Sequence, residues 1–422
     1  MNDTGKFDYD AVAHAQATLL STGRVNVRRR IGAYRVLVEA AMPAYLPKLA
    51  EALLELGYQV PRDRPQNALP VWAEAVEIAR RIEHTVPGRT QLLRRALDAY
   101  QRDLYRVGDQ AAGFAIRQEM AGVGTEAFAS GSVDSPVYMH ARLADAYAEE
   151  GRHDAAAEIY GRIVAAERSR EGTDASFWSI LAWSAQLDAA GQPDAAIDAL
   201  TELVTASGAK LEEGRSSLAI MVWELVHLSR MLDARERQTE ARGARAEAGK
   251  LLAELADSGE RKSWSNIMNW WLVLFSLSGA CEEPTRPGSP IAPLYLSLGW
   301  SPDLRRSFLD ERAALERESA RLAALVELEP GTYLPELMIV HRRVTIRAAI
   351  KQNGHHYRFL ENLRPLFDDS VTFAQRLADQ GSDRCALVLA RALTDRAMLL
   401  VAGKSYSEAL GDFRAAITAL SS

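Results

Sequence analysis

Cysteine is nearly absent from this chain of 422 residues, and long hydrophobic runs are missing. The two cysteines, Cys281 and Cys385, are too few for a disulfide framework and fit a reducing compartment. We expect both to be buried as small hydrophobic residues. The longest apolar run, Trp270 to Leu277, is far shorter than the roughly 20 residues that a membrane-spanning helix needs. The sequence therefore predicts neither a disulfide-stabilised secreted domain nor a membrane protein.

A strong excess of one charge is missing as well. The 50 Lys and Arg residues stand against 56 Asp and Glu residues, so the net charge is -6, which disfavours nucleic acid or an anionic membrane as a partner. The N-terminal sequence MNDTGKFDYD has no apolar core behind a basic start, so we expect no secretory signal and a cytoplasmic location. Lysine is rare beside arginine and alanine is abundant, which indicates a GC-rich bacterial gene.

Motifs that carry chemistry are also missing. The sequence holds no HExxH, CxxC, GxSxG or GxxxxGK[ST] run, and its eight histidines are scattered. His355 and His356 are adjacent, so on a helix they point about 100° apart and cannot share a metal as an i, i+4 pair can. We therefore expect no metal, no cofactor and no catalytic residue, although an active site assembled from distant residues stays open.

What the sequence does contain is helical periodicity. Hydrophobic residues make up 48% and charged residues 25%, which are ordinary globular values. Apolar residues at helical spacing, with Gly or Pro at the boundaries, predict about eighteen helices. No alternating run flanks an Asn-Gly or Asp-Gly pair, so no strand is predicted. Expected helix ends are Gly57, Gly108, Gly151 and Gly191, and expected starts are Pro43, Pro136, Pro193 and Pro302.

One pattern recurs three times. In residues 140–167, small and large apolar residues on two helical segments flank a glycine, and the small ones allow close helix packing. The repeat-defining residues of this copy are Leu143, Ala144, Tyr147, Gly151, Ala156 and Tyr160. Those of the copy forty residues on are Trp183, Leu187, Gly191, Ala196 and Leu200. The C-terminal copy contains Ala409, Phe413 and Ala416.

This pattern resembles the tetratricopeptide repeat (TPR), a helix-turn-helix unit of 34 residues. A degenerate copy in residues 46–78, with an inserted connection YQVPRDRPQ, resembles the longer repeats of actinobacterial TPR-like proteins. The resemblance implies an all-α, right-handed α-solenoid of antiparallel helix pairs that is degenerate in its N-terminal part and around residues 262–358. We predict one continuous array over residues 1–422. Its parts are degenerate repeats in 1–125, the clearest repeats in 126–260, a divergent aromatic, Pro-rich and basic region in 261–358, and a C-terminal repeat and cap in 359–422.

The aromatic segment around residues 262–300 breaks the pattern. Trp264, Trp270, Trp271 and Phe275 are typical of a helix that is covered on all sides. The alternative is an exposed aromatic patch, Trp264 to Trp271, for a partner or for a homo-oligomer.

Two sets of polar residues are candidates for binding. Residues 341–358 contain basic residues and no acid, which predicts a patch for an anion or an acidic partner at Arg342, Arg343, Arg347, Lys351 and Arg358. The TPR resemblance implies that the first helix of each unit lines a concave groove. Groove residues would then be Tyr138, Arg142, Asp145, Glu149, Trp178 and Asp188.

Three functions are compatible with these features. The first is a non-enzymatic adaptor or scaffold that binds a partner protein or peptide on its concave surface in a bacterial cytoplasm. The second is a regulatory TPR protein that senses a peptide or small ligand and acts on a signalling or transcriptional partner. The third is an enzyme or enzyme subunit with a site in residues 262–358.

Overall fold

The structure is a computed structural model. It describes residues 8–21, 26–40, 43–133, 137–169, 175–262, 267–283, 301–352, 358–379 and 383–421. In these segments the regular elements are α-helices and three short 3-10 turns, at residues 43–45, 65–67 and 280–282, and no strand is present. The all-α prediction is confirmed.

The chain forms two compact units. The first unit comprises Met1–Ala146 with Ser301–Asp303, and the second comprises Tyr147–Trp300 with Leu304–Ser422. Helix α7 (Val137–Glu149) and helix α14 (Pro302–Asp310) each contribute residues to both units. The single continuous array over residues 1–422 stays a prediction.

The first unit is a series of consecutive helix pairs. Its helices are α1 (Tyr9–Leu20), α2 (Val27–Glu39), α3 (Leu46–Gln59), α4 (Leu69–Arg81), α5 (Arg89–Arg106) and α6 (Gln110–Ala129). Each helix packs against the next one in the sequence. Trp72 lies at the centre of its core and donates a hydrogen bond from Nε1 to Asp103 Oδ2 over 2.7 Å.

Gly57 lies inside α3, and the prediction that it ends the helix is wrong. A Cβ at this position would lie 2.3 Å from the ring of Trp72. Glycine is therefore needed here for the close approach of α3 and α4. Gly151 and Gly191, by contrast, follow helices with φ values of 74° and 75°, as the repeat pattern predicts.

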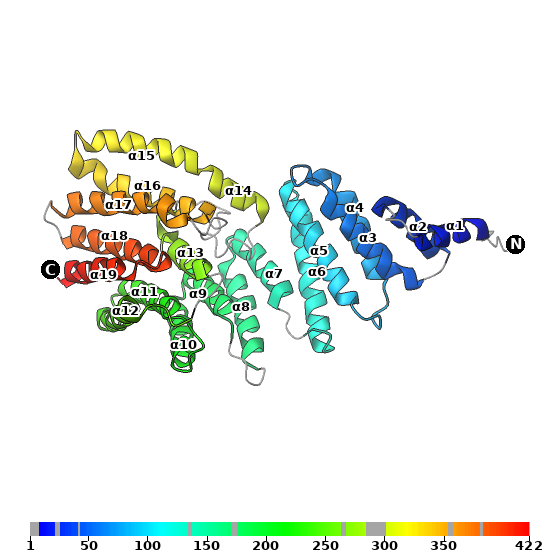
Figure 1. The fold of residues 1–422 in the computed structure, drawn as a ribbon, viewed down its shortest axis with the longest axis horizontal. Coiled ribbons are helices and arrows are strands. Elements are labelled where there is room, and N and C mark those ends of the chain that lie inside the picture. The colour runs from blue at the N-terminus through cyan, green and yellow to red at the C-terminus, as the bar shows by residue number, and fades with distance from the viewer. Residues whose placement is uncertain are drawn as a thin grey trace. The chain divides into compact units, whose positions relative to one another are not determined.

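The second unit contains two stacks of helices (Figure 1). Neighbours in sequence pack side by side in each stack. The first stack contains α8 (His153–Arg168), α9 (Phe177–Ala189), α10 (Pro193–Glu212), α11 (Leu218–Asp233) and α12 (Gln238–Ser258). The second stack contains α15 (Arg312–Val326), α16 (Pro330–Lys351), α17 (Phe359–Ala378), α18 (Asp383–Ala402) and α19 (Tyr406–Ser421).

The two stacks meet at their ends. Helix α19 packs against α12, and α18 contacts α11, although some 150 residues or more separate them in sequence. An open array contains contacts between neighbouring units only. The second unit is therefore a helical-repeat fold that closes back on itself.

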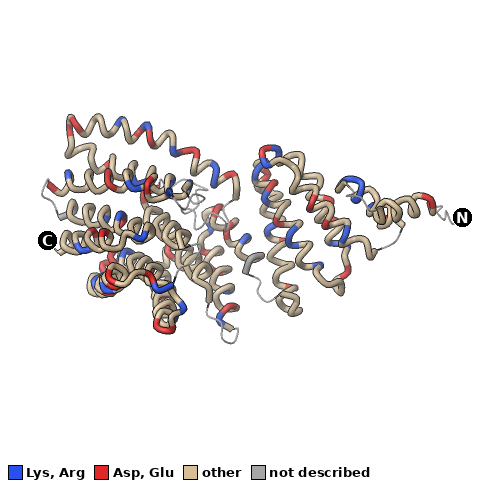
Figure 2. The backbone as a smooth tube through the Cα atoms, in the orientation of Figure 1, with Lys and Arg blue, Asp and Glu red and all other residues tan. Residues whose placement is uncertain are grey.

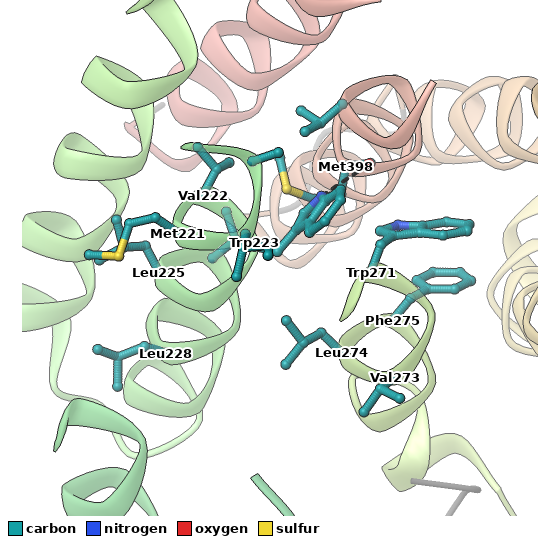
Figure 3. Close-up of a cluster of buried hydrophobic side chains, with 14 of the residues drawn as sticks. Met221, Val222, Trp223, Leu225, Leu228, Trp271, Val273, Leu274, Phe275 and Met398 are labelled. Atoms are coloured by element: carbon teal, nitrogen blue, oxygen red, sulfur yellow. Dashed lines mark hydrogen bonds between the residues drawn. The ribbon is translucent and has the colours of Figure 1, made fainter. Parts of the chain in front are cut away.

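Helix α13 (Ile267–Leu277) fills the space between the stacks, in contact with α11, α16 and α18. Figure 3 shows its Trp271 and Phe275 side by side, with Met398 of α18 close to Trp223 of α11. The Trp271 and Phe275 rings are stacked with centroids 5.6 Å apart, and both side chains are buried. The prediction of a helix covered on all sides is confirmed for α13, whereas Trp264 lies outside the described residues.

Candidate functional site

The second unit contains a cavity of about 630 Å³. Its walls come from α9, α10, α11 and α12 of the first stack and from α18 and α19 of the second, with residues 277–281 at the end of α13. This volume is in the range of sites that bind small molecules or a few residues of a peptide. The cavity is the candidate functional site because helices that are distant in sequence build it together.

Most of the cavity wall is apolar. Leu387 is 58% exposed and belongs to the wall, so an apolar side chain lies open to solvent there. The apolar side chains include Leu181, Ile197, Met231, Leu277, Leu387 and Phe413.

Two ion pairs form part of the wall. Arg235 contacts Asp188 over 3.2 Å between Nη2 and Oδ1, and Arg245 pairs with Asp233. Each of these arginines faces one carboxylate, so the two pairs add no net charge to the cavity.

A second group of charges surrounds Arg230 and Arg391, which also line the cavity. Arg230 Nη2 donates to Asp395 Oδ1 over 2.6 Å. Arg391 Nη1 lies 2.6 Å from Glu282 Oε1, and its Nη2 donates to the carbonyl oxygen of Ser278 over 2.9 Å.

Arg342 is not part of the cavity wall, but it bonds to the carboxylates of both Asp395 and Glu282. Its Nε donates to Asp395 Oδ2 over 2.9 Å, and its Nη1 donates to Glu282 Oε2 over 3.1 Å. Three arginines therefore share two carboxylates, which leaves one positive charge in excess in this group.

The pKa values reflect this charge balance. Burial, together with the neighbouring Arg342, lowers the pKa of Arg391. Burial disfavours the charged form of Asp395, yet Arg342 and Arg230 hold the pKa of this carboxyl well below its usual range. Asp395 is thus an anion at neutral pH.

His227 of α11 is a further polar group in the wall. Its side chain is buried, and its Nδ1 has no hydrogen-bond partner in the protein. Burial and the nearby Arg230 lower its pKa to about 3, so the imidazole is neutral at pH 7. A buried nitrogen without a partner is uncommon in proteins, and at the wall of a cavity it indicates a place where a ligand can bond.

The sequence contains one pattern that could have indicated the polar residues of α11 as part of a site. Glu224, His227 and Arg230 recur at spacings of three in a helix that is mostly apolar. Polar groups at such spacing lie on one face of a helix. Arg391 stands in α18 without any comparable pattern.

The predicted basic patch in residues 341–358 is in fact largely buried. Arg347 has no exposed side-chain surface, and its guanidinium bonds to Glu283 and Glu311. Arg343 is 13% exposed and also pairs with Glu283. With Arg342 in the group described above, three of the five residues are paired with carboxylates from other segments, so no basic surface forms at these three. Lys351 and Arg358 are exposed and lie outside the cavity wall.

The predicted groove residues separate in the structure. Asp145 and Glu149 are buried and not exposed in a groove. Arg142 has a 12% exposed side chain whose Nε lies 3.8 Å from Asp98 Oδ1. The side chain of Tyr138 lies outside the described residues.

Trp178 and Asp188 complete the groove set. Trp178 is half-buried, with ring centroids 4.8 Å from Phe177 and 4.9 Å from Trp270. Among the six, Asp188 is the residue that lines the cavity. A role for the set in partner binding stays a prediction.

Cys281 differs from its prediction. It is exposed and lines the cavity, whereas Cys385 is buried as expected. Cys281 lies in the short 3-10 turn after α13, where the chain leaves the core. The site thus carries a thiol at its surface that can report on occupancy.

Three observations concern the described part of the chain as a whole. No helix there combines the length and hydrophobicity that crossing a bilayer requires. No group of three His, Cys, Asp or Glu residues there is placed to hold a metal ion. Figure 2 shows acidic and basic residues interspersed along the helices.

The helix pairs, with small residues buried where the helices cross, define an all-α helical-repeat fold. Two solved structures are similar to it. TPR-like repeats of a kinesin light chain from Podospora anserina share 18% identity, over 51% of this chain and 98% of that one, with a TM-score of 0.37. A circular tandem repeat protein shares 16% identity, over 97% of this chain and 96% of that one, with a TM-score of 0.18.

No protein-family model matches the chain, and no curated protein matches it. The class therefore rests on the helix pairs and their packing.

Proposed function

We propose that this protein is a bacterial helical-repeat adaptor that binds a segment of a partner protein in the cavity of its second unit. The observation that carries the proposal is the apolar cavity of about 630 Å³, which can hold several side chains and offers a few polar groups to orient them. An apolar wall supplies most of the binding free energy, and the polar groups select the ligand.

A photo-crosslinking amino acid at Leu387 tests this proposal in living bacterial cells. Leu387 is exposed and lines the cavity, so we expect a specific crosslinked protein. The matched control is the same amino acid at Leu328, which is 76% exposed and lies outside the cavity wall. Identical adducts at both positions, or none at Leu387, would contradict the proposal.

Substitutions that fill the cavity provide a second test of the adaptor proposal. Ala185 is half-buried in the cavity wall, so Ala185→Trp should place a large ring in the space and abolish the crosslink. Ala166, a half-buried residue of α8 outside the wall, is the matched control, and Ala166→Trp should leave the crosslink unchanged. Thermal unfolding of both variants verifies that they are folded.

A second candidate function is a ligand sensor, and the origin of the cavity wall favours it. Because both stacks line the cavity, a ligand would stabilise the contact between α11 and α18. Hydrogen exchange tests this candidate: ligand should slow exchange throughout α18 and α19. Slower exchange at the cavity wall alone would favour the adaptor.

An enzyme with a site in residues 262–358 receives less support. In the described part of this range Arg342 and Arg347 form buried ion pairs with Asp395 and Glu283 of other segments. These pairs are suited to holding segments together and not to proton transfer with a substrate.

A further inference from the structure

The polar groups of the cavity favour one chemical class of ligand. Arg230, Arg391 and His227 all line the space, and the positive charge of Arg230 is close enough to lower the pKa of both His227 and Arg391. The three side chains come from α11 of the first stack and α18 of the second. They form a polar patch in an otherwise mostly apolar wall, and we refer to it as the arginine-histidine patch.

Both arginines of this patch have donors to spare. A guanidinium carries five N–H groups. Arg230 makes one hydrogen bond in the described part of the protein, through Nη2 to Asp395. Arg391 uses its two terminal nitrogens for Glu282 and Ser278, and its Nε has no acceptor among the described residues.

His227 adds an independent observation. Its Nδ1 has no hydrogen-bond partner although the side chain is buried and borders the cavity. Leaving such a group without a partner costs about 1 to 3 kcal/mol of stability. With the proton of the neutral imidazole on Nδ1, this nitrogen can donate a hydrogen bond to an acceptor atom of a ligand, which would remove the cost. The patch is thus built for an acceptor, and its charge specifies an anion.

The net charge of the group around Arg391 favours an anion with one negative charge over an anion with two. The charges that act on Arg391 are Arg230 and Arg342, which are positive, and Asp395 and Glu282, which are negative. With Arg391 itself, the group has one unbalanced positive charge. A single negative charge would neutralise it, whereas a phosphate with two charges would leave an unpaired anion in a largely apolar space.

We propose that the cavity binds the carboxylate of an otherwise apolar ligand, with Arg230, Arg391 and His227 donating hydrogen bonds to it and the apolar wall enclosing the rest. This inference rests on the proposed function and specifies its ligand. The carboxylate can come from the C-terminus of an apolar peptide or from a free aliphatic acid, and both share the same group and the same apolar body.

Calorimetric titration of the full-length protein tests this proposal. The probes are acetyl-Leu-Leu-Phe with a free carboxylate and the same peptide as its carboxamide, then decanoate and decanol. Hydrogen bonds to charged groups contribute about 1.5 to 3 kcal/mol. We therefore expect each acid to bind tenfold or more tightly than its neutral counterpart. The tighter acid, peptide or decanoate, identifies the source of the carboxylate.

Two variants, Arg391→Gln and Arg230→Gln, test whether these arginines bind the carboxylate of the acid probes. Arg391→Gln leaves Glu282 paired with Arg342, and Arg230→Gln leaves Asp395 paired with Arg342, so neither removal strands a carboxylate. Each should weaken binding of the acid tenfold or more and leave the carboxamide or alcohol unchanged. The matched control is the double variant Arg235→Gln with Asp188→Asn, which removes a cavity ion pair without changing the net charge of the wall, and it should change the affinity less than threefold.

Cys281 reports whether the probes occupy the cavity. Because this thiol is exposed at the wall and Cys385 is buried, an aromatic disulfide reagent should react with Cys281 first, and a bound acid should slow this reaction. Equal affinity for acid and neutral probe, or equal effects of Arg391→Gln and of the charge-neutral double variant at Arg235 and Asp188, would overturn the carboxylate proposal. In that case a crosslink at Leu387 would still support the adaptor, whereas loss of that crosslink would overturn the adaptor itself.

Discussion

Trp223 of α11 donates a hydrogen bond from its indole Nε1 to the carbonyl oxygen of Met398 in α18, over 3.3 Å and across 175 residues of sequence. The tryptophan is 2% exposed and lies against the same space as Trp271 and Phe275. Figure 3 shows Trp223 and Met398 side by side. This bond joins the two stacks that build the cavity.

Trp223→Phe tests the contact between the stacks. The ring is smaller and the indole hydrogen bond to Met398 is lost, so the free energy of unfolding of the second unit should fall by about 1 to 3 kcal/mol. Hydrogen exchange should accelerate around Met398. The matched control is Trp178→Phe, a half-buried tryptophan of α9, which should leave exchange in α18 unchanged. Unchanged exchange in both variants would show that the bond contributes nothing to the contact.

Gly57→Ala should destabilise the first unit. The new Cβ would lie 2.3 Å from the ring of Trp72, so α3 and α4 would have to separate, and overpacking of this kind costs about 1 to 3 kcal/mol or more. The measurement is urea unfolding. Gly32→Ala in α2 is the control, because its Cβ would meet nothing within 4 Å. There alanine should stabilise the helix by about 0.5 to 1 kcal/mol.

Asp395→Asn should strongly destabilise the second unit. The change removes the carboxylate that Arg230 and Arg342 share, and uncompensated buried charge costs about 3 to 5 kcal/mol. Because the folded state holds the pKa of Asp395 below its usual range, the difference between wild type and variant should be complete at neutral pH. It should shrink as the pH falls below 3.8, where the unfolded carboxyl takes up a proton.

The control for this prediction is an exposed ion pair. Arg376 Nη1 lies 2.9 Å from Glu327 Oε1, and both side chains are well exposed. Glu327→Gln should change the free energy of unfolding by about 1 kcal/mol or less. Equal effects of the two substitutions would show that burial of Asp395 does not determine its contribution.

Glu224→Gln should make stability less dependent on pH. Burial raises the pKa of Glu224 from 4.5 to about 8, against a hydrogen bond with Ser207. Between these values the unfolded state is ionised while the folded state keeps its proton, so the free energy of unfolding of the wild type falls as the pH rises. The variant lacks this loss, and its advantage should grow from pH 4.5 to pH 8, to the order of a few kcal/mol.

His227 should change the free energy of unfolding with pH in the opposite direction, so it serves as a control for the Glu224 prediction. Its pKa is lowered from 6.5 to about 3, so the unfolded state binds a proton first and stability is lost as the pH falls from 6.5 towards 3. His227→Phe should weaken that acid-side loss alone. Thermal unfolding midpoints of both variants from pH 3 to pH 9 separate the two effects.

Helix pairs could be predicted from the sequence because their signals are local. Gly151 and Gly191 end their helices with positive φ, and Ala156 and Ala196 are fully buried, as the repeat pattern requires. Gly57 was assigned wrongly because the sequence alone does not tell a glycine that ends a helix from one that lies beneath a large ring. That ring belongs to Trp72, in the next helix.

The cavity could not be predicted from the sequence because distant segments build it. Arg391 and Arg230 are 161 residues apart in sequence, and nothing in either segment indicates that Asp395 and Glu282 lie between them. The basic residues 342–347 illustrate the same limit: their own segment contains no acid, so the sequence suggested exposed charge. The carboxylates that neutralise them come from Glu282, Glu283 and other segments.

The packing of α19 on α12 restricts how the gene for this protein can change in length. In an open row of repeats, duplication or deletion of one helical hairpin lengthens or shortens the row and leaves the other units in place. Here a hairpin gained or lost between α13 and α18 would move α19 away from its partner and open the cavity. The number of hairpins in the second unit should therefore be fixed among descendants that retain its ligand.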